Sequence, residues 1–227
     1  MDEFNINDLF KREDPEKAIR QLRAYRELMM LYECALREVT TKFEVLRAEF
    51  NVRYNRNPVE TVKTRIKELP SILGKLKRKG LPLNLDALRE NIFDVAGVRV
   101  ICSFQKDIYS LCEMFLRQDD VRLIRKKDYI QNPKDNGYRS LHLIVEVPIF
   151  LTESTEQMRV EVQFRTIAMD FWASLEHTTS YKREIPDAER IASELRDCAD
   201  EIARLDLRMQ AIHEYIGDGG PKGTAGE

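Results

Sequence analysis

Two acidic residues, Asp94 and Glu161, occupy positions where carboxylates could bind a metal ion. Asp94 stands between an expected helix and an expected strand, and Glu161 lies in a run of alternating apolar and polar residues. That alternation puts Gln163 on the same face as Glu161, because successive side chains of a strand point to opposite sides. Two carboxylates from adjacent strands can hold Mg²⁺ against nucleotide phosphates. The pair indicates phosphate chemistry; a turn role for Asp94 and a solvated strand face around Glu161 are the alternatives.

His142 belongs to a second alternating segment. Residues 139–147 and 158–166 each alternate and are separated by a loop, so we expect them to form an antiparallel pair. Such pairing would bring His142 into the polar group that contains Glu161 and Gln163. The sequence therefore predicts one polar sheet face with a histidine beside the carboxylate.

Arg99 follows Asp94 in a β-branched run, residues 95–104, that is typical of a buried strand. Strict alternation would put Asp94 and Arg99 on opposite faces. Gly97 lies between them, and a glycine tolerates a local irregularity. We expect an irregularity at Gly97 to bring both side chains to one site.

Basic residues are concentrated in residues 59–79, whose apolar spacing favours a helix. Pro70 interrupts this pattern, so we expect two short helices. On the first, Arg65 falls inside the apolar arc. On the second, one side is polar and consists of Ser71, Lys75 and Arg78.

Long helices are expected at both ends of the chain. Apolar residues recur at spacings of three and four from Leu22 to Phe50, and residues 191–216 repeat the pattern. Each seam could pack on its own domain or form an oligomer interface, and the presence of two seams favours oligomerisation.

Shorter elements are expected between these helices. The patterns predict helices at 84–93, 108–117 and 167–181, a strand at 121–124 and a polar loop at 129–138. Pro186 is expected to open the last helix, and the Gly-rich residues 217–227 are expected to be disordered.

Composition excludes several classes. The 227 residues carry a net charge of only −2, which disfavours a dedicated nucleic-acid binder. The four cysteines are scattered, which is typical of reduced thiols in a cytoplasmic protein. We expect neither a signal peptide nor a membrane span. The three histidines lie in separate segments, so a His-rich metal site or a histidine-dependent hydrolase centre is not expected.

Four motifs carry a family resemblance. They are FDVAGVR at 93–99, YIQNPKDNGYRSLHL at 129–143, VEVQFRT at 160–166 and FWASLEH at 171–177. With these motifs the chain resembles the synthetase domain of RelA/SpoT homologues and, more narrowly, the small alarmone synthetases, over roughly residues 20–215.

The resemblance implies an α+β fold, in which a nucleotidyltransferase-like mixed β-sheet is flanked by helices, with long N- and C-terminal helices. It implies an N-terminal helical flank at 1–56, a catalytic domain at 57–183, a C-terminal helix at 184–216 and a tail at 217–227. It also implies transfer of the β,γ-diphosphate of ATP to the 3′-hydroxyl of GTP or GDP, with GMP a further acceptor to test. The products would be AMP and the alarmone (p)ppGpp of the stringent response.

The resemblance also assigns roles to residues. Asp94 would bind Mg²⁺, and Glu161 would be a second ligand or receive the 3′-hydroxyl proton. Tyr138 would stack on guanine. The other acceptor-site residues would be Lys127, Lys134, Asn136, His142 and Gln163. Adenine would lie between Arg65 and Arg99, and the ATP phosphates would face Lys67, Ser71, Lys75 and Arg78.

Family members assemble as homotetramers, which agrees with the two apolar seams. Some are activated by pppGpp through lysines of the N-terminal helix. Residues 40–44 contain a single lysine, Lys42, close to Glu44. This composition favours the subtype that is not activated.

Two other functions are compatible with the same scaffold. A relative that pyrophosphorylates the 3′ end of tRNA would need a nucleic-acid surface, which near-neutral charge disfavours. A non-catalytic guanine-nucleotide or RNA sensor would not need both carboxylates, Asp94 and Glu161. We therefore expect ATP and GTP or GDP as partners, with no membrane and no stable nucleic-acid partner.

Overall fold

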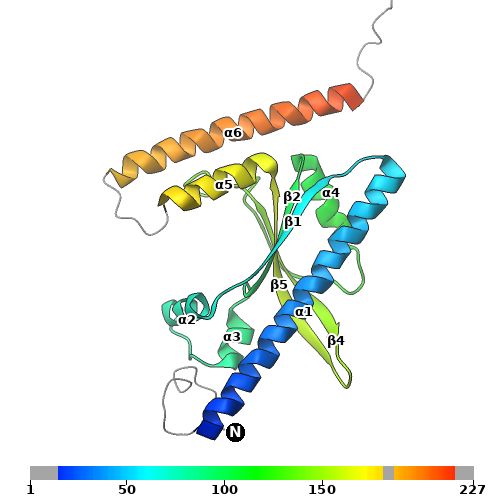
Figure 1. The fold of residues 1–227 in the computed structure, drawn as a ribbon. Helices are drawn as coiled ribbons and strands as arrows, with labels where there is room; N and C mark the ends of the chain where they lie inside the picture. Colours follow the sequence, from blue (N-terminus) through cyan, green and yellow to red (C-terminus); the bar gives the residue numbers. More distant parts are fainter. Residues whose placement is uncertain (1–14, 181–186, 218–227) are drawn as a thin grey trace, which may run out of the picture.

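The structure, a computed structural model, describes residues 15–180 and 187–217. Its centre is a five-stranded mixed sheet with the order β1-β2-β5-β4-β3 (Figure 1). The central pair, β2 and β5, is parallel, and the other neighbouring pairs are antiparallel. The strands are β1 (Val59–Ile66), β2 (Ala96–Cys102), β3 (Arg122–Asp128), β4 (Leu141–Phe150) and β5 (Thr155–Thr166). The expected mixed sheet and the expected antiparallel pair, β4 with β5, are confirmed.

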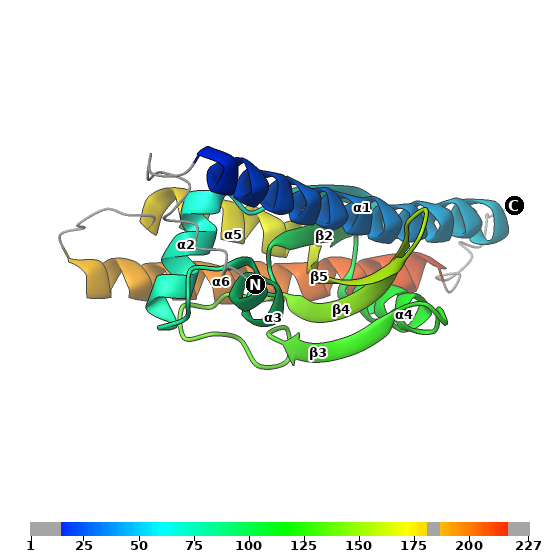
Figure 2. The ribbon, with the colours of Figure 1, turned by 90° about the horizontal axis from the view of Figure 1, so that it is seen from below.

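Helices flank this sheet, as expected. They are α1 (Pro15–Tyr54), α2 (Leu69–Arg78), α3 (Leu85–Asn91), α4 (Gln105–Leu116), α5 (Ile167–Ser180) and α6 (Ala188–Gly217). The view in Figure 2 shows α1 running along one side of the sheet. Asn84 begins α3, because its side-chain oxygen accepts a hydrogen bond from the Ala87 amide at 2.8 Å.

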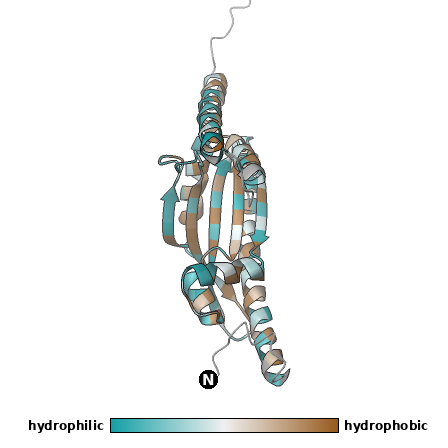
Figure 3. Ribbon diagram, turned by 90° about the vertical axis from the view of Figure 1, so that its left-hand side faces the viewer, coloured by the Kyte–Doolittle hydropathy of each residue, from teal (hydrophilic) through white to brown (hydrophobic). Residues whose placement is uncertain are grey.

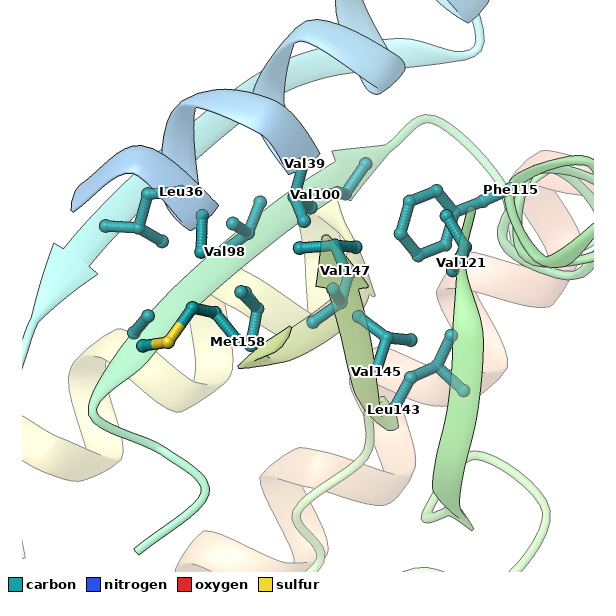
Figure 4. Packing of buried hydrophobic residues seen from close by; sticks show 14 of the residues in the cluster. Leu36, Val39, Val98, Val100, Phe115, Val121, Leu143, Val145, Val147 and Met158 are labelled. Carbon is teal, nitrogen blue, oxygen red and sulfur yellow. The ribbon is translucent and has the colours of Figure 1, made fainter. Parts of the chain in front are cut away.

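The apolar seam of α1 packs on the chain's own sheet. Val39 and Phe43 are fully buried, and Leu36 is nearly so. Figure 4 shows Leu36 and Val39 of α1 near Val98 and Val100 of β2. Of the two interpretations of this seam, packing on its own domain is the one that the structure shows for α1.

The seam of α6 behaves differently. This helix packs against α5 and extends past it (Figure 1). Several of its apolar side chains are about half exposed or more, among them Leu205, Met209, Ile212 and Ile216.

Hydrophobic and hydrophilic residues alternate in bands along the strands of the sheet, as Figure 3 shows.

The prediction of a helix at residues 59–66 is wrong, because this segment is the strand β1. Val62 and Ile66 are four residues apart, and positions i and i+4 share a face in a helix and in a strand alike. The deciding features are the β-branched residues and the free edge of β2, with which β1 pairs. Arg65 therefore lies on a strand face rather than inside an apolar helical arc.

The strand expected at 121–124 is also longer than predicted, since β3 continues through Asp128. Charged residues such as Arg125 and Lys127 are accommodated because β3 is an edge strand, half solvated and paired only with β4. The expectations for Pro186 and for residues 218–227 lie outside the described residues.

The fold predicts the effect of a substitution in its core. The Phe43 ring stacks on Phe115 at 4.7 Å between centroids and meets Phe164 edge-on at 5.6 Å. Phe43→Ala should lower the free energy of unfolding by about 3–5 kcal/mol, because it leaves a cavity between α1, α4 and β5. Urea unfolding at a fixed protein concentration measures this loss. Val45→Ala, at a position 60% exposed on the same helix, should change it by less than about 0.5 kcal/mol. Equal losses for both variants would contradict the assigned core.

Candidate active site

Strand register brings polar side chains from all five strands onto one face of the sheet. One row of paired residues crosses the whole sheet and consists of Lys63, Arg99, Gln163, His142 and Lys127. The adjacent row consists of Arg65, Gly97, Glu161, Ile144 and Arg125. Because side chains two residues apart on a strand share a face, these rows form a single surface. The polar face predicted around Glu161 is thus confirmed, and it is broader than predicted.

Asp94 reaches this face from the turn that precedes β2. Its carboxylate pairs with Lys67 Nζ at 2.5 Å and with Lys75 Nζ at 2.8 Å. The expected irregularity at Gly97 is wrong, since β2 pairs in continuous register with both neighbours through this residue. Asp94 lies outside the strand, so the alternation of β2 does not constrain its side chain.

The surroundings of Asp94 keep it ionised. Burial raises its pKa, but hydrogen bonds and positive charge from Lys67 and Lys75 outweigh burial and hold the pKa below its ordinary value. Asp94 is therefore a carboxylate at neutral pH, and its two lysines concentrate positive charge beside it.

Glu161 is held by two neighbours. His142 Nδ1 lies 3.3 Å from one carboxylate oxygen, and the Gln163 amide donates to the other at 2.9 Å. Burial raises the pKa of Glu161, but these contacts outweigh burial and lower it overall. His142 contacts the Tyr138 hydroxyl through Nε2 at 2.9 Å. The predicted grouping of Glu161, Gln163 and His142 is thus present.

Two cavities open on the polar face. The first has a volume of about 470 Å³ and receives Asp94, Lys127, Lys134, His142 and Glu161. The second, of about 300 Å³, lies between β1, β2 and β5 and is lined by Lys63, Arg65, Arg99, Glu161 and Gln163. Among the residues that the structure describes, Glu161 is the one that lines both of these cavities. Two groups, one bound in each cavity, would therefore come together at Glu161.

The loop before β4 presents Tyr138 and Lys134. Lys134 Nζ lies 4.7 Å from the Tyr138 ring centroid and 4.8 Å from that of Tyr129. Asn136 does not line the first cavity; its side-chain oxygen accepts a hydrogen bond from the Tyr138 amide at 3.2 Å and so shapes the loop.

Helix α6 holds this loop in place. Gly137 adopts a φ of +87°, and a Cβ atom there would lie 2.5 Å from the Cβ of Ala199. Arg139 donates to Asp200 at 2.9 Å. A glycine at 137 is therefore needed both for the backbone conformation and for the close approach of α6.

Five predicted site residues line neither cavity: Lys67, Ser71, Arg78, Asn136 and Tyr138. Lys67 still pairs with Asp94, and Tyr138 with His142. Ser71 and Arg78 are exposed on α2. They share the side of α2 that carries Lys75, while Ile72 and Leu76 are buried on the other side, as predicted.

Two buried residues that the sequence did not single out as functional connect the site. Asp170, near the start of α5, accepts hydrogen bonds from Arg99 at 3.1 Å and Lys63 at 3.2 Å. It also accepts one from Arg165 at 2.9 Å. The alternation of residues 160–166 puts Arg165 on the same face as Glu161, and this was the one sequence feature that could have indicated a role for Arg165. No sequence pattern indicated Asp170, because it lies on a different element, α5, and comes close to the site only when the chain folds.

The donor set of the site fits Mg²⁺. No cluster of three or more His, Cys, Asp or Glu side chains within residues 15–180 and 187–217 could hold a metal ion alone. Mg²⁺ is often bound by one or two carboxylates together with substrate phosphates and water. Asp94 and Glu161 are both ionised and line the first cavity, which matches this requirement.

Comparisons with known proteins agree on one family. The model described as "Region found in RelA / SpoT proteins" matches residues 64–186. The chain is 43% identical to GTP pyrophosphokinase YwaC of Bacillus subtilis (strain 168), over 85% of this chain and 91% of the relative.

Two crystal structures from Bacillus subtilis share the fold. Small alarmone synthetase 2 has a TM-score of 0.75 and 43% identity, covering 84% of this chain and 98% of that one. Small alarmone synthetase 1 bound to its product pppGpp has a TM-score of 0.78 and 31% identity, covering 86% of this chain and 99% of that one.

The ion pairs of Asp170 predict a pH dependence. Burial raises its pKa, but Lys63, Arg99 and Arg165 together lower it below the ordinary value. The stabilisation is thus present above the unfolded pKa of about 4 and is lost as pH falls through the folded pKa. Asp170→Asn should lower the free energy of unfolding by about 2 kcal/mol at pH 7. Urea unfolding between pH 7 and pH 3 should show this difference shrinking in acid, and a constant difference would refute the assigned ion pairs.

Proposed function

The chain belongs to the RelA/SpoT family, among its small alarmone synthetases, and from this membership we propose that it is a GTP diphosphokinase that makes (p)ppGpp. It transfers the β,γ-diphosphate of ATP to the 3′-hydroxyl of GTP or GDP and releases AMP. The observation that carries this proposal is the position of Glu161, which lines two cavities rich in cationic side chains. A donor and an acceptor nucleotide bound in them would react at that carboxylate.

The second cavity suits the ATP base. Arg65 and Arg99 both line it, from adjacent strands, and planar guanidinium groups stack on aromatic rings. The ATP phosphates then extend toward Lys67 and Lys75 beside Asp94. Ser71 and Arg78, on the same side of α2 as Lys75, complete the donor site along the exposed face of the helix.

The first cavity suits the guanine nucleotide. Tyr138 does not line this cavity but contacts two residues that do, Lys134 and His142, and from there its ring would be offered to the base. Asn136 sets the loop that carries Tyr138. Lys127 and Lys134 supply positive charge for the acceptor phosphates. His142 and Gln163 orient Glu161 toward the acceptor.

The reaction needs one proton acceptor and a means of neutralising charge. Glu161 takes the proton of the 3′-hydroxyl, the 3′-oxygen forms a bond to the β-phosphorus of ATP, and the bond from that phosphorus to the α-phosphate oxygen breaks. AMP leaves with the electron pair of that bond. Mg²⁺, bound by Asp94 and Glu161, would neutralise the phosphate charge. The lowered pKa of Glu161 keeps it ionised and able to accept the proton.

A homotetramer is part of this proposal. Half-exposed apolar residues lie on α5, at Ile167, Phe171 and Leu175, and on α6, which packs against α5. Apolar side chains in such number are typical of a subunit interface. A second copy of the chain is the expected occupant, as in the family that the sequence resembles.

Localisation in the cytoplasm is also proposed, on the scattered free cysteines. No helix within residues 15–180 and 187–217 is both long enough and apolar enough to cross a bilayer.

A transfer assay tests the proposed reaction. Purified protein with γ-labelled ATP and Mg²⁺ should release AMP and label GTP or GDP. Glu161→Gln should slow this transfer by about 10²- to 10⁴-fold, because the proton acceptor is lost. Glu156→Gln is the matched control, since Glu156 lies on the same strand and pairs with Arg89 outside both cavities.

Three outcomes would contradict this assignment. An absence of transfer to GTP, GDP and GMP would overturn the proposed activity. Label on tRNA alone would replace it with a tRNA pyrophosphokinase. A fully active Glu161→Gln variant would remove Glu161 from its role.

Light scattering tests the assembly. The wild-type particle should have about four times the 26.7 kDa mass of one chain. The double variant Leu205→Glu/Met209→Glu should yield smaller particles, because it places charges in the apolar face of α6. Leu123→Glu, at an exposed apolar position on β3, should leave the mass unchanged. A wild-type monomer would refute the proposed tetramer.

A further inference from the structure

Asp170 and Arg165 form a buried ion pair next to the polar face of the sheet. Arg165 is 5% exposed and Asp170 8% exposed, and their nearest atoms are 2.9 Å apart. Neither residue lines the first or the second cavity. The pair therefore acts on bound nucleotides only through the side chains that it contacts.

One end of this pair reaches the second cavity. Asp170 accepts hydrogen bonds from Arg99 and Lys63, and both of these residues line that cavity. The Arg99 guanidinium shares the oxygen Oδ1 of Asp170 with Arg165. A displacement of the Arg99 guanidinium therefore changes the electrostatic environment of Arg165, because both side chains pair with the same oxygen of Asp170.

The other end of the pair reaches the loop before β4, which carries Tyr138. Arg165 Nη2 donates to the Tyr138 hydroxyl at 2.8 Å, and the guanidinium carbon lies 5.1 Å from the centroid of the same ring. Since a guanidinium has several donors in a rigid plane, Arg165 can hold Asp170 and Tyr138 at once. Its orientation fixes the position of the ring.

The chain of contacts ends at Glu161. Because Arg165 donates to the Tyr138 oxygen, the Tyr138 proton is free to be donated to His142 Nε2, 2.9 Å away. His142 then carries its own proton on Nδ1, which faces the Glu161 carboxylate at 3.3 Å. Each group in this chain donates a hydrogen bond to the next, from Arg165 through Tyr138 and His142 to Glu161. This arrangement selects the tautomer of His142 that carries its proton on Nδ1.

We propose that Asp170 and Arg165 are positioning residues that couple the two nucleotide sites, so that either nucleotide strengthens the binding of the other. This inference rests on the proposed function, because it takes the second cavity as the ATP site and the first as the acceptor site. A base stacked on Arg99 restricts that side chain and, through Asp170, restricts Arg165 and Tyr138. The acceptor then binds to a ring that is already ordered and loses less conformational entropy.

Coupling of this kind is reciprocal, and that makes it measurable. The factor by which the ATP analogue lowers the Kd of GDP must equal the factor by which GDP lowers the Kd of the analogue. Calorimetric titrations with α,β-methylene ATP, GDP and Mg²⁺ give both factors, since the methylene bridge blocks transfer. We expect a factor of about 5 to 20 for the wild type.

Two variants test the pair itself. Asp170→Asn keeps the shape but removes the charge, and Arg165→Lys keeps the charge but removes the planar fork. Each should bring the coupling factor close to about one. Their combination should lose no more coupling than either variant alone, because both act in one chain of contacts.

Asp107→Asn is the matched control. Asp107 is also a buried aspartate bonded to an arginine, Arg56, with both contacts at 2.6 Å, and it lies at the start of α4 away from both cavities. This variant should be destabilised yet retain the wild-type coupling. If Asp170→Asn fails to fold, Arg165→Lys carries the test.

The outcomes separate the two proposals. A wild-type factor of one with both nucleotides bound would overturn the coupling and leave the proposed function intact. Wild-type protein that binds neither nucleotide would overturn both. Unchanged coupling in Asp170→Asn and Arg165→Lys would show that the pair serves stability alone.

Discussion

The parallel pairing of β2 with β5 is the constraint on which the site depends. It sets Gly97 opposite Glu161 and Arg99 opposite Gln163. The strands on either side of this pair, β1 and β4, then add Arg65 and His142 through antiparallel registers. A shift of one residue between β2 and β5 would turn the polar face into the core. The buried valines that face α1 prevent this shift, so the apolar side of the sheet determines the geometry of the polar side.

Charge on the polar face is balanced pair by pair. Asp94 faces two lysines, and Asp170 faces two arginines and a lysine. Ionised groups in such surroundings are stable only with partners, because desolvation of a lone charge is costly. The same partners would supply cations for the triphosphate of the proposed donor nucleotide. In the proposed function, stability and phosphate binding would therefore draw on one set of side chains.

Local patterns predicted the sheet face better than the connections between elements. Alternation was sufficient to place His142 beside Glu161, since the two strands are neighbours in sequence. It failed at Val62 and Ile66, whose spacing fits a helix and a strand equally well. It could not reach Asp170, because that residue meets Arg99 only after α5 has packed beside β2 and β5. Interactions between distant segments depend on tertiary packing, which single-sequence periodicity does not encode.

The shared position of Glu161 also bears on inhibitor design. A compound with one purine for each cavity, joined by a linker that passes this carboxylate, would occupy both cavities as a single molecule. Its second half would bind at a high effective concentration, because the first half is already in place. The cationic side chains that line both cavities would favour a linker with negative charge, like that of the phosphates it would replace. Enzymes that bind only one of the two nucleotides would not reproduce the fit.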